Sequence, residues 1–518
     1  MTVEIGAGLS LADVVAVADG APVAFPELAR ASVAAARAVV ERAVSSGDVI
    51  YGVTTGFGAL ADTRIDAEQA AELQHGIIRS HATAVGEPLS REEARAMLLL
   101  RAHVLALGHS GVRAEVIDLM VRMLNEDVIP AVPQQGSLGA SGDLAPLANL
   151  ALPLIGHGSV LSPEGGVEPA APAFVRAGLA PLSLEAKEGL ALVNGTQGML
   201  AIGILTCHRA ERLARTADVV AAMTIEAALG TDAPFDERLQ RLRPHPGQNA
   251  SASNLRRLLA GSPILASHRD SHHMVQDAYS LRCAPQVHGA TRDALAYATA
   301  VLRIEAGSVS DNPIVLPGQG EDDDDDDDEI RAGGNFHGQP VAVAMDTVAT
   351  ALVSLASISE RRLYRLLDPK QNNDLPAFLV HGSGLNSGFM LVQYTAASLV
   401  SESKSLAHPA SVDSIPSSAG QEDHVSMGMT SARHARDVVT NAETVIALEA
   451  LAATQALDLR APLEPGSATR AVHDVIRTRV PFFAADREFG PDIADAISLV
   501  REGALVAAAE SAVGSALD

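Results

Sequence analysis

The chain has 518 residues, of which 47% are hydrophobic and 3% aromatic, and it contains no tryptophan. A chain of this length can bury a large core, and its low aromatic content favours helices, because strands prefer β-branched and aromatic side chains. The formal net charge of −25 argues against a nucleic-acid partner, since binding a phosphate backbone requires a basic face.

Cysteine content and apolar segments indicate the compartment. Cys207 and Cys283 are too few for a disulfide framework and are typical of a reducing environment. The first residues lack the basic and apolar segments of a secretion signal, and the apolar stretch over 144–162 is interrupted by proline and glycine. We therefore expect a cytoplasmic protein that does not associate with a membrane.

Helical patterns recur along the chain. A helix is predicted over 25–46, with a proline near its start and a glycine after its end. Ser90 and Glu93 form a capping box ahead of a second helix over 94–107. Because long helices usually pack beside one another, the longer patterns predict a mainly α fold built on a bundle. These patterns cover 197–230, 289–307, 339–366, 388–406, 432–458 and 489–515.

The connectors between these helices hold unusual polar clusters, and function often lies on such loops. We predict an N-terminal part over 1–195 and a helix bundle over 196–518, joined as one cooperative unit without a clear linker. The run of nine acids over 321–329 repels itself and is interpreted as a solvated surface insertion, with cation binding as the alternative. The connectors that hold the unusual polar clusters cover residues 51–58, 136–146, 276–286 and 415–424.

The connector over 136–146 reads G-S-L-G-A-S-G-D-L-A-P. In a tight turn, the amide nitrogen of Gly142 can attack the carbonyl carbon of Ala140. One water leaves, and Ser141 then loses its hydroxyl group. The product is a methylidene-imidazolone (MIO), an electron-poor ring that serves as an electrophile. Glycine suits the attacking position because it has no Cβ and tolerates unusual backbone angles. The tripeptide Ala-Ser-Gly alone is common, so the prediction of an MIO depends on all eleven residues of the segment 136–146.

This run resembles the prosthetic-group loop of the histidine/phenylalanine/tyrosine ammonia-lyase family, whose pattern is G-S-[LV]-G-A-S-G-D-L-x-P. The resemblance extends over nearly the whole chain. It implies an aspartase/fumarase-like long-helix bundle with a smaller N-terminal part that bears the MIO. It also implies a homotetramer with shared active sites, and an MIO formed without an external cofactor or metal.

The resemblance assigns catalytic roles to three residues outside the loop. Tyr51, in Y-G-V-T-T-G-F-G, matches the base that removes the substrate β-proton, and it would need a lowered pKa because tyrosine ordinarily titrates near 10. Asn194, in L-V-N-G-T, matches a buried asparagine beside the electrophile. Tyr279, in Q-D-A-Y-S-L-R-C, matches a tyrosine close to the MIO. Judged alone, Tyr51 would be interpreted as a turn tyrosine packed on Phe57, and Asn194 as part of a turn.

The resemblance also assigns substrate-binding residues. The planar guanidinium of Arg282 suits bidentate capture of an α-carboxylate, although a structural salt bridge is the alternative. Phe336, in G-G-N-F-H, matches an apolar wall, although a core phenylalanine would look the same. Gln276 begins the block Q-D-A-Y-S-L-R-C, and Gln421 begins the block Q-E-D-H. Both blocks match the family pattern.

Two positions point to the substrate. His81, in R-S-H-A, and Glu422, in Q-E-D-H, resemble the histidine-specific branch. A carboxylate can pair with an imidazole ring, whereas it would be an unpaired charge against a phenyl ring. The resemblance therefore implies non-oxidative deamination of L-histidine to trans-urocanate and ammonia, the first step of histidine catabolism. Gly420 and Gln339 depart from the family pattern, and Gly420 is expected to enlarge the substrate pocket.

Alternatives remain open at this point. One is a phenylalanine or tyrosine ammonia-lyase, or an aminomutase of the same family, and another is a catalytically silent helical scaffold. A metal site is not expected, because the spacing of His268, Asp270, His272 and His273 fits no zinc pattern and predicts a polar surface loop.

Overall fold

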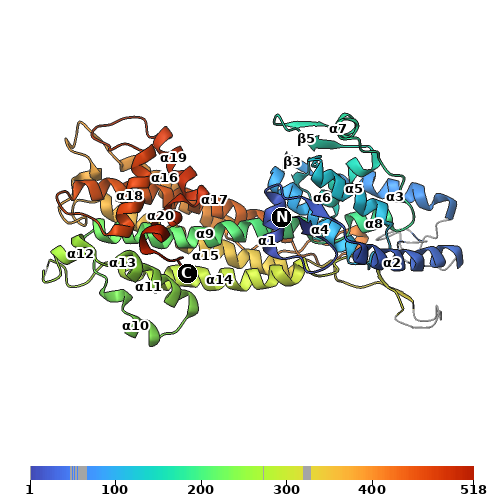
Figure 1. Ribbon diagram of the computed structural model, residues 1–518, viewed down its shortest axis with the longest axis horizontal. Coiled ribbons are helices and arrows are strands. Elements are labelled where there is room, and N and C mark those ends of the chain that lie inside the picture. Colours follow the sequence, from blue (N-terminus) through green and yellow to red (C-terminus); the bar gives the residue numbers. More distant parts are fainter. Residues whose placement is uncertain are drawn as a thin grey trace. The chain divides into compact units, whose positions relative to one another are not determined.

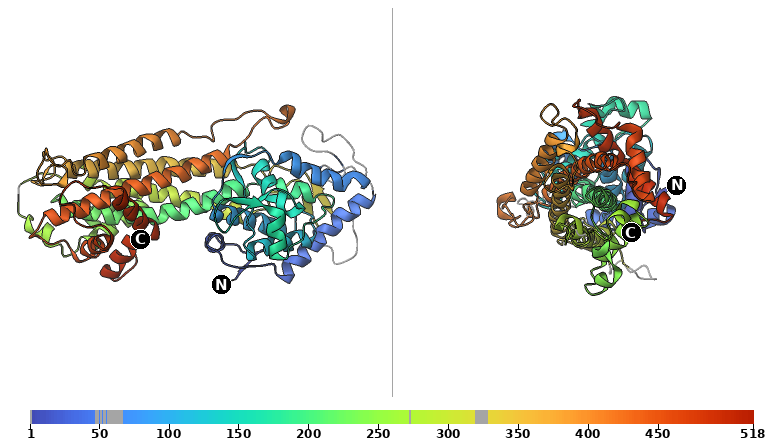
Figure 2. Two further views of the ribbon diagram at one scale, coloured as in Figure 1. Left: turned by 90° about the horizontal axis from the view of Figure 1, so that it is seen from above. Right: turned by 90° about the vertical axis from the view of Figure 1, so that its left-hand side faces the viewer.

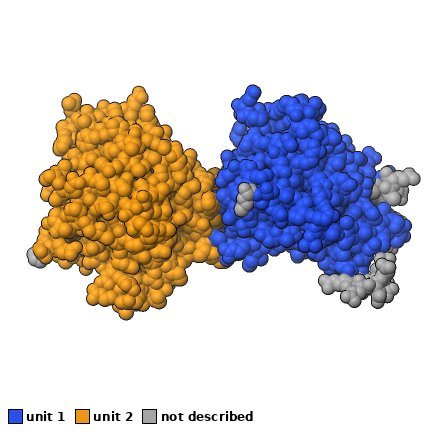
Figure 3. All heavy atoms as spheres, in the orientation of Figure 1, with its two compact units in different colours: residues 1–205, 299–346, 409–433 blue, residues 206–298, 347–408, 434–518 orange. Residues whose placement is uncertain are grey.

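The structure is a computed structural model of the chain (Figure 1). It describes residues 2–46, 50, 52, 55, 67–271, 273–318 and 328–518. Its contacts divide the chain into two compact units, which Figure 3 shows in different colours. Unit 1 comprises Met1–Leu205, Thr299–Asp346 and Pro409–Arg433, and unit 2 comprises Thr206–Ala298, Thr347–His408 and His434–Asp518.

The two units do not follow chain order, so the predicted division after residue 195 falls inside unit 1. The physical reason is that each of four long helices contains residues of both units. A single cut of the chain therefore cannot separate the two units. These helices are α9 (Gln197–Ala227), α14 (Ala284–Ala306), α15 (Gln339–Leu367) and α17 (Gly428–Leu459).

Unit 1 is built from short helices and small two-stranded sheets. The strands pair as β1 (Val3–Glu4) with β2 (Val23–Ala24), β3 (Val85–Pro88) with β4 (Pro133–Gln135), β5 (Ser159–Leu161) with β6 (Val167–Pro169), and β7 (Ile314–Leu316) with β8 (Glu329–Arg331). Only the first pair is parallel. The helices are α1 (Leu11–Ala18), α2 (Glu27–Ser46), α3 (Ala67–His81), α4 (Arg91–Ala106), α5 (Ala114–Asn125), α6 (Leu144–Ala151), α7 (Ala170–Ala177) and α8 (Glu188–Val193).

Helix α4 is the central helix of unit 1. The predicted capping box is present, because the Ser90 side chain accepts from the Glu93 N–H and the Glu93 carboxylate accepts from the Ser90 N–H. Every residue from Glu93 to Ala106 is buried. A helix that is buried on all sides must be surrounded by other elements, and α4 accordingly packs against α1, α2 and α5.

Unit 2 is a bundle of long helices with shorter helices around it. Figures 1 and 2 show α9, α14, α15 and α17 running alongside one another. The remaining helices of this unit are α10 (Glu237–Arg241), α11 (Pro246–Leu258), α12 (Pro263–Ser267), α13 (Tyr279–Arg282), α16 (Met390–Leu406), α18 (Ser467–Arg479), α19 (Gly490–Glu502) and α20 (Ala504–Val513).

A buried polar network joins the four long helices within unit 2. The Glu449 carboxylate of α17 accepts from Thr224 of α9 (2.7 Å), Ser359 of α15 (2.6 Å) and the Arg362 guanidinium. Arg362 also donates to Nε2 of His288 on α14 (3.3 Å). An arginine can only donate, so Nδ1 of His288 carries the hydrogen that points to Asp218. The network satisfies polar groups that would otherwise be costly to bury.

The mainly α prediction is confirmed, and the long predicted helices agree with the structure except at the C-terminal end. The pattern over 489–515 predicts one helix, but the chain forms α19 and α20, which meet at Gly503. Gly503 has φ +76° and caps α19 through the carbonyl oxygens of Leu499 and Val500. A left-handed glycine ends a helix even where the apolar periodicity continues.

Helix α15 has a composition that also occurs in membrane spans. Among the described helices it alone is long and apolar enough to cross a membrane by length and composition. However, 56% of its most apolar window is buried inside the protein, as in the core helix of a bundle. Its apolar character is therefore explained by packing.

Candidate active site

The predicted self-modifying tripeptide lies in a tight reversal of the chain. Gly139 and Gly142 form an antiparallel bridge, so the turn between them contains only Ala140 and Ser141. Ser141 (φ +49°) and Gly142 (φ +77°) both adopt left-handed backbone conformations. This conformation costs a non-glycine residue about 1–2 kcal/mol. The turn brings residues 140 and 142 back toward each other, as a ring closure between them requires.

The backbone of Gly195 holds one side of this turn. Its N–H donates to the carbonyl oxygen of Ser141 (3.2 Å), and its carbonyl oxygen accepts from the N–H of Asp143 (2.7 Å). A Cβ at Gly142 would overlap the carbonyl group of Gly195. Glycine at position 142 is therefore required by this close approach as well as by the cyclisation chemistry.

Three helix N-termini meet at the turn. Asp143 is the N-cap of α6, and its carboxylate accepts from the N–H of Met199 in the first turn of α9 (2.8 Å). Met427, just before α17, donates its N–H to the carbonyl oxygen of Leu138 (3.0 Å). Burial raises the pKa of Asp143 to about 6, although hydrogen bonds from Met199 and Ser137 oppose the shift. Each N-terminus carries about half a positive charge, which favours an electron-accepting group at the turn.

A cavity of about 480 Å³ opens beside the turn, within the size range of small-molecule sites. All of its lining residues belong to unit 1. His337 and His424 stack in its wall, with ring centroids 5.9 Å apart. The lining comprises Ala140, Ser141, Asn312, Ala332, Gly333, Phe336, His337, Gln421, Glu422, Asp423 and His424. The structure thus brings five of the predicted site residues together, namely Ala140, Ser141, Phe336, Gln421 and Glu422.

Glu422 reaches this cavity from a tight hairpin. Ser417 and Glu422 are paired through their backbones, and the Ser417 hydroxyl donates to the Glu422 carboxylate (2.8 Å). Ser418, Ala419 and Gly420 between them have φ values of +51°, +54° and +88°. Gly420 does not line the cavity, and a Cβ there would meet open space. The expectation that Gly420 enlarges the pocket stays a prediction, and the left-handed backbone at this position gives glycine a role in the turn.

Two further predicted residues lie in unit 1 outside the cavity lining. The buried amide nitrogen of Asn194 donates to the carbonyl oxygen of Asn312 (2.7 Å), and Asn312 lines the cavity. Asn194 is therefore next to the cavity wall. His81 is the last residue of α3, with Nδ1 3.0 Å from the hydroxyl oxygen of Ser80.

The remaining predicted residues belong to unit 2 or lie outside the described part of the chain. Tyr279 and Arg282 form α13, and the Arg282 guanidinium lies over the Tyr279 ring at 4.7 Å. The Tyr279 side chain is 72% exposed, and Gln276 is exposed as well. Tyr51 lies outside the described residues, so its role stays a prediction.

Several polar segments carry other contacts. His268 and His273 place ring nitrogens 2.8 and 3.2 Å from the carbonyl oxygens of Gly230 and Leu229. His272 lies outside the described residues, as do 321–327 of the acidic run. In the described end of that run, Asp328 pairs with Arg42.

Gln339 is the first residue of α15. Its side-chain amide nitrogen donates to the carbonyl oxygen of Ser411 (3.1 Å), so this departure from the family pattern has a structural contact.

Comparison with known proteins now identifies the family. The model of the family described as "Aromatic amino acid lyase" matches residues 9–478. The chain belongs to this family. The histidine ammonia-lyases of Sorangium cellulosum and Gloeobacter violaceus are 53% and 52% identical to this aromatic amino acid lyase. These alignments cover 98% of this chain, and 99% and 97% of the relatives. The family predicted from the 136–146 motif is confirmed.

Solved structures share the fold of this aromatic amino acid lyase. Histidine ammonia-lyase from Trypanosoma cruzi matches with a TM-score of 0.90 and 42% identity, covering 99% of this chain and 95% of the other. Tyrosine aminomutase from Streptomyces globisporus matches with a TM-score of 0.92 and 38% identity over 100% of both chains. These neighbours confirm the predicted long-helix fold class.

Sequence reasoning missed two residues of this aromatic amino acid lyase site. Ser417, which holds the Glu422 carboxylate, carries no signal beyond its place five residues earlier. Arg101 donates to the carbonyl oxygen of Asn194 and to the side chain of Gln197, next to Gly195, which bonds the turn. Its signal was visible, because it is a single charge in the otherwise apolar run Met97–Val104, apart from His103.

Proposed function

We propose that this chain deaminates L-histidine non-oxidatively to trans-urocanate and ammonia, as the first step of histidine catabolism. The observation that carries the proposal is the single cavity shared by the turn at Ala140–Ser141 and the carboxylate of Glu422. The turn can supply an electrophile, and the Glu422 carboxylate can pair with an imidazole N–H of the substrate. Relatives named histidine ammonia-lyase that are more than half identical over nearly the whole chain support the same substrate.

We propose that Ala140, Ser141 and Gly142 form an MIO. The reversal at 139–142, the left-handed angles and the convergent helix N-termini fit this group. When formed, the MIO supplies an electron-poor methylene that makes the departure of the substrate amine easier. No external cofactor or metal is part of the proposal.

The residues of the chain then divide the remaining work. Glu422 holds the substrate imidazole in one tautomer, with Gln421 beside it, and Phe336 provides an apolar wall. Asn194 anchors the backbone beside the turn through Asn312. Tyr51 removes the β-proton, and a well-placed base of this kind contributes roughly 10²–10⁴ in rate.

We propose that the active enzyme is a homotetramer in which other subunits complete each site. Gln276, Tyr279 and Arg282 would contribute from a neighbouring subunit, with Arg282 binding the substrate carboxylate in its planar fork, and His81 would contact the imidazole. Exposed apolar side chains on helices α14 and α16 support association with further copies, because such surfaces are usually covered. They include Tyr297 and Ile304 on α14, and Leu391 and Tyr394 on α16. The cytoplasm is the proposed location, supported by two free cysteines.

The decisive experiment compares wild type with Ser141→Ala. Wild type is expected to produce urocanate, followed by its ultraviolet absorbance, and to have an intact mass lower than the sequence mass by two water molecules. Ser141→Ala removes the hydroxyl that must leave and is expected to keep the full mass and to lose nearly all activity. A wild-type protein with the full sequence mass and no urocanate production would leave only the silent scaffold.

A second candidate is an aminomutase, or a lyase that acts on phenylalanine or tyrosine. The 38% identity to a tyrosine aminomutase over the full chain favours it. Product analysis with histidine, tyrosine and phenylalanine separates the candidates. Release of ammonia and urocanate from histidine supports our proposal, whereas a β-amino acid formed from tyrosine supports the second candidate.

A further inference from the structure

Arg101 is a buried cation on which the charge of Asp311 acts favourably. It lies in the middle of α4 between Leu100 and Ala102, and its side chain is 0% exposed. Within the described part of the chain, it forms no ion pair, and its Nε and Nη2 atoms have no hydrogen-bond partner. Burying a guanidinium in this way costs several kcal/mol, so packing alone does not explain the residue.

The contacts of Arg101 point to the turn that carries the predicted MIO. Its Nη1 atom donates to the carbonyl oxygen of Asn194 (2.6 Å) and to the side-chain oxygen of Gln197 (2.8 Å). Gln197 in turn donates to the hydroxyl of Ser310 (2.7 Å). A Cβ at Gly195 would lie 2.6 Å from Nη1, so the guanidinium leaves no room for a side chain at this position. Arg101 therefore fixes Asn194–Gly195, the segment that bonds the turn.

Gly195 transmits this constraint to the turn. Its N–H and carbonyl group bond the backbones of Ser141 and Asp143, as described above. A cyclisation between Gly142 and Ala140 requires that these backbone segments keep one fixed position relative to each other. A shift of Asn194–Gly195 by a fraction of an ångström would alter the approach of the Gly142 nitrogen, because reacting groups must be held closely.

We propose that Arg101 is a positioning residue for MIO formation: by holding the carbonyl oxygen of Asn194, it sets the Gly195 backbone against which the Ala140-Ser141-Gly142 turn cyclises. In that step the Gly142 nitrogen bonds to the Ala140 carbonyl carbon, whose oxygen leaves as water with the amide hydrogens of Gly142 and Ser141, and a C=N bond forms to the Ser141 nitrogen. Ser141 then loses its hydroxyl group and α-hydrogen as a second water, so no oxidant or reductant is needed. This inference rests on the proposed function.

The test measures MIO content separately from folding. Arg101→Met removes the charge and the donors while keeping an unbranched apolar side chain. We expect the fraction of chains with the two-water mass deficit to fall roughly tenfold or more, because the charged hydrogen bond that holds Asn194, next to Gly195, is lost. Arg101→Lys keeps the charge with a different donor geometry, and we expect an intermediate fraction. Urocanate production should fall in proportion to the modified fraction.

Arg95→Met is the matched control on the same helix. Arg95 is also an arginine of α4, 4% exposed, but it donates to the carbonyl oxygens of Val17 and Leu124 and to Asp127. We expect Arg95→Met to lower thermal stability and to retain the full mass deficit. A merely structural role for Arg101 would make both variants behave alike.

The outcomes separate this inference from the proposed function. A wild-type chain without the mass deficit overturns the proposed function. A wild-type chain with the deficit, together with a folded Arg101→Met variant that carries the same deficit, overturns the inference alone. If Arg101→Met does not fold, Arg101→Lys decides by the rate at which newly synthesised chains acquire the deficit: a slower rate supports the role, and an unchanged rate overturns it.

Discussion

The Ser417 hydroxyl holds the side chain that we propose selects the substrate. It donates to one oxygen of Glu422, so the other oxygen stays available to an imidazole N–H. The backbone pairing of these two residues restricts the carboxylate further. A carboxylate fixed in this way binds its partner without first losing rotational freedom.

Replacing this serine is expected to affect binding more than chemistry. Ser417→Ala should raise the KM for histidine about fivefold to tenfold with little change in kcat, because a hydrogen bond to a charged group is lost in a partly exposed site. Ser417→Thr keeps the hydroxyl and serves as the control, with a KM close to wild type. Steady-state kinetics of both variants check this, and a kcat loss at constant KM in Ser417→Ala would contradict it.

At the scale of the elements, α9, α14, α15 and α17 are joined by polar residues in the core of unit 2. Glu449 and Arg362 are both fully buried and form a bidentate pair. The network specifies which helix faces meet, because each donor must find its acceptor on another helix.

Removing only one partner of this ion pair is expected to lower the stability of the protein. Glu449→Leu leaves the Arg362 guanidinium buried without its carboxylate, and we expect the free energy of unfolding to fall by about 3–5 kcal/mol. Denaturant unfolding measures this. The double variant Glu449→Leu/Arg362→Met removes both charges and should recover most of the loss. A double variant as unstable as the single one would show that the pair itself stabilises the bundle.

For the molecule as a whole, the pH dependence of stability comes from a buried group whose pKa is lowered in the folded state and from one whose pKa is raised. Asp218 is fully buried, which raises its pKa, but the charge of Arg292 and the hydrogen bond with His288 outweigh burial and lower the pKa to about 2. Its folded pKa is below its unfolded value, so its contribution is present above about pH 4 and is lost as the pH falls toward 2. His473 behaves in the opposite sense.

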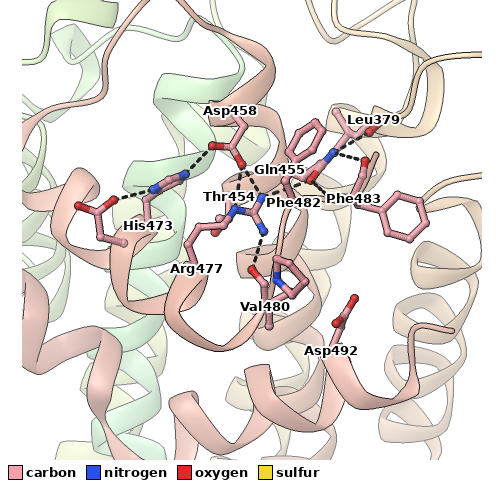
Figure 4. A network of polar contacts seen from close by, with 12 residues as sticks. Leu379, Thr454, Gln455, Asp458, His473, Arg477, Val480, Phe482, Phe483 and Asp492 are labelled. Atoms are coloured by element: carbon pink, nitrogen blue, oxygen red, sulfur yellow. Dashed lines mark hydrogen bonds and ion pairs between the residues drawn. The ribbon is translucent and has the colours of Figure 1, made fainter. Parts of the chain in front are cut away.

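The cluster around His473 predicts a loss of stability at alkaline pH (Figure 4). Burial lowers the pKa of His473, but hydrogen bonds with Asp458 (2.8 Å) and Asp474 (2.9 Å) outweigh it and raise the pKa. The stabilisation is therefore complete below the unfolded pKa of about 6.5 and is lost as the pH rises through the higher folded pKa. Arg477 also binds Asp458, so this carboxylate stays charged throughout.

Thermal unfolding of wild type and His473→Gln across this range checks the prediction. We expect the wild-type advantage in Tm to be largest below about pH 6.5 and to shrink as the pH increases. An advantage that stays constant up to alkaline pH would mean that the protonated form is not the stabilising one.

Much of this protein follows from local sequence. The tripeptide at 140–142, the capping box at Ser90 and the long helices depend on residues close together in the chain, where turn preferences and periodicity act directly. The helix predicted over 489–515 is instructive, because Gly503 was present in the sequence and its left-handed cap was the missed local signal.

Only the tertiary structure decides which distant residues meet. It places Arg101 of α4 against Asn194, and Gly195 against Ser141, although long stretches of chain separate them. It also assigns Tyr279 and Arg282 to a different unit from the turn at Ser141, which their shared family motifs did not reveal. The physical reason is that helix periodicity and turn chemistry act over a few residues, whereas burial and hydrogen bonding between elements depend on the path of the whole chain.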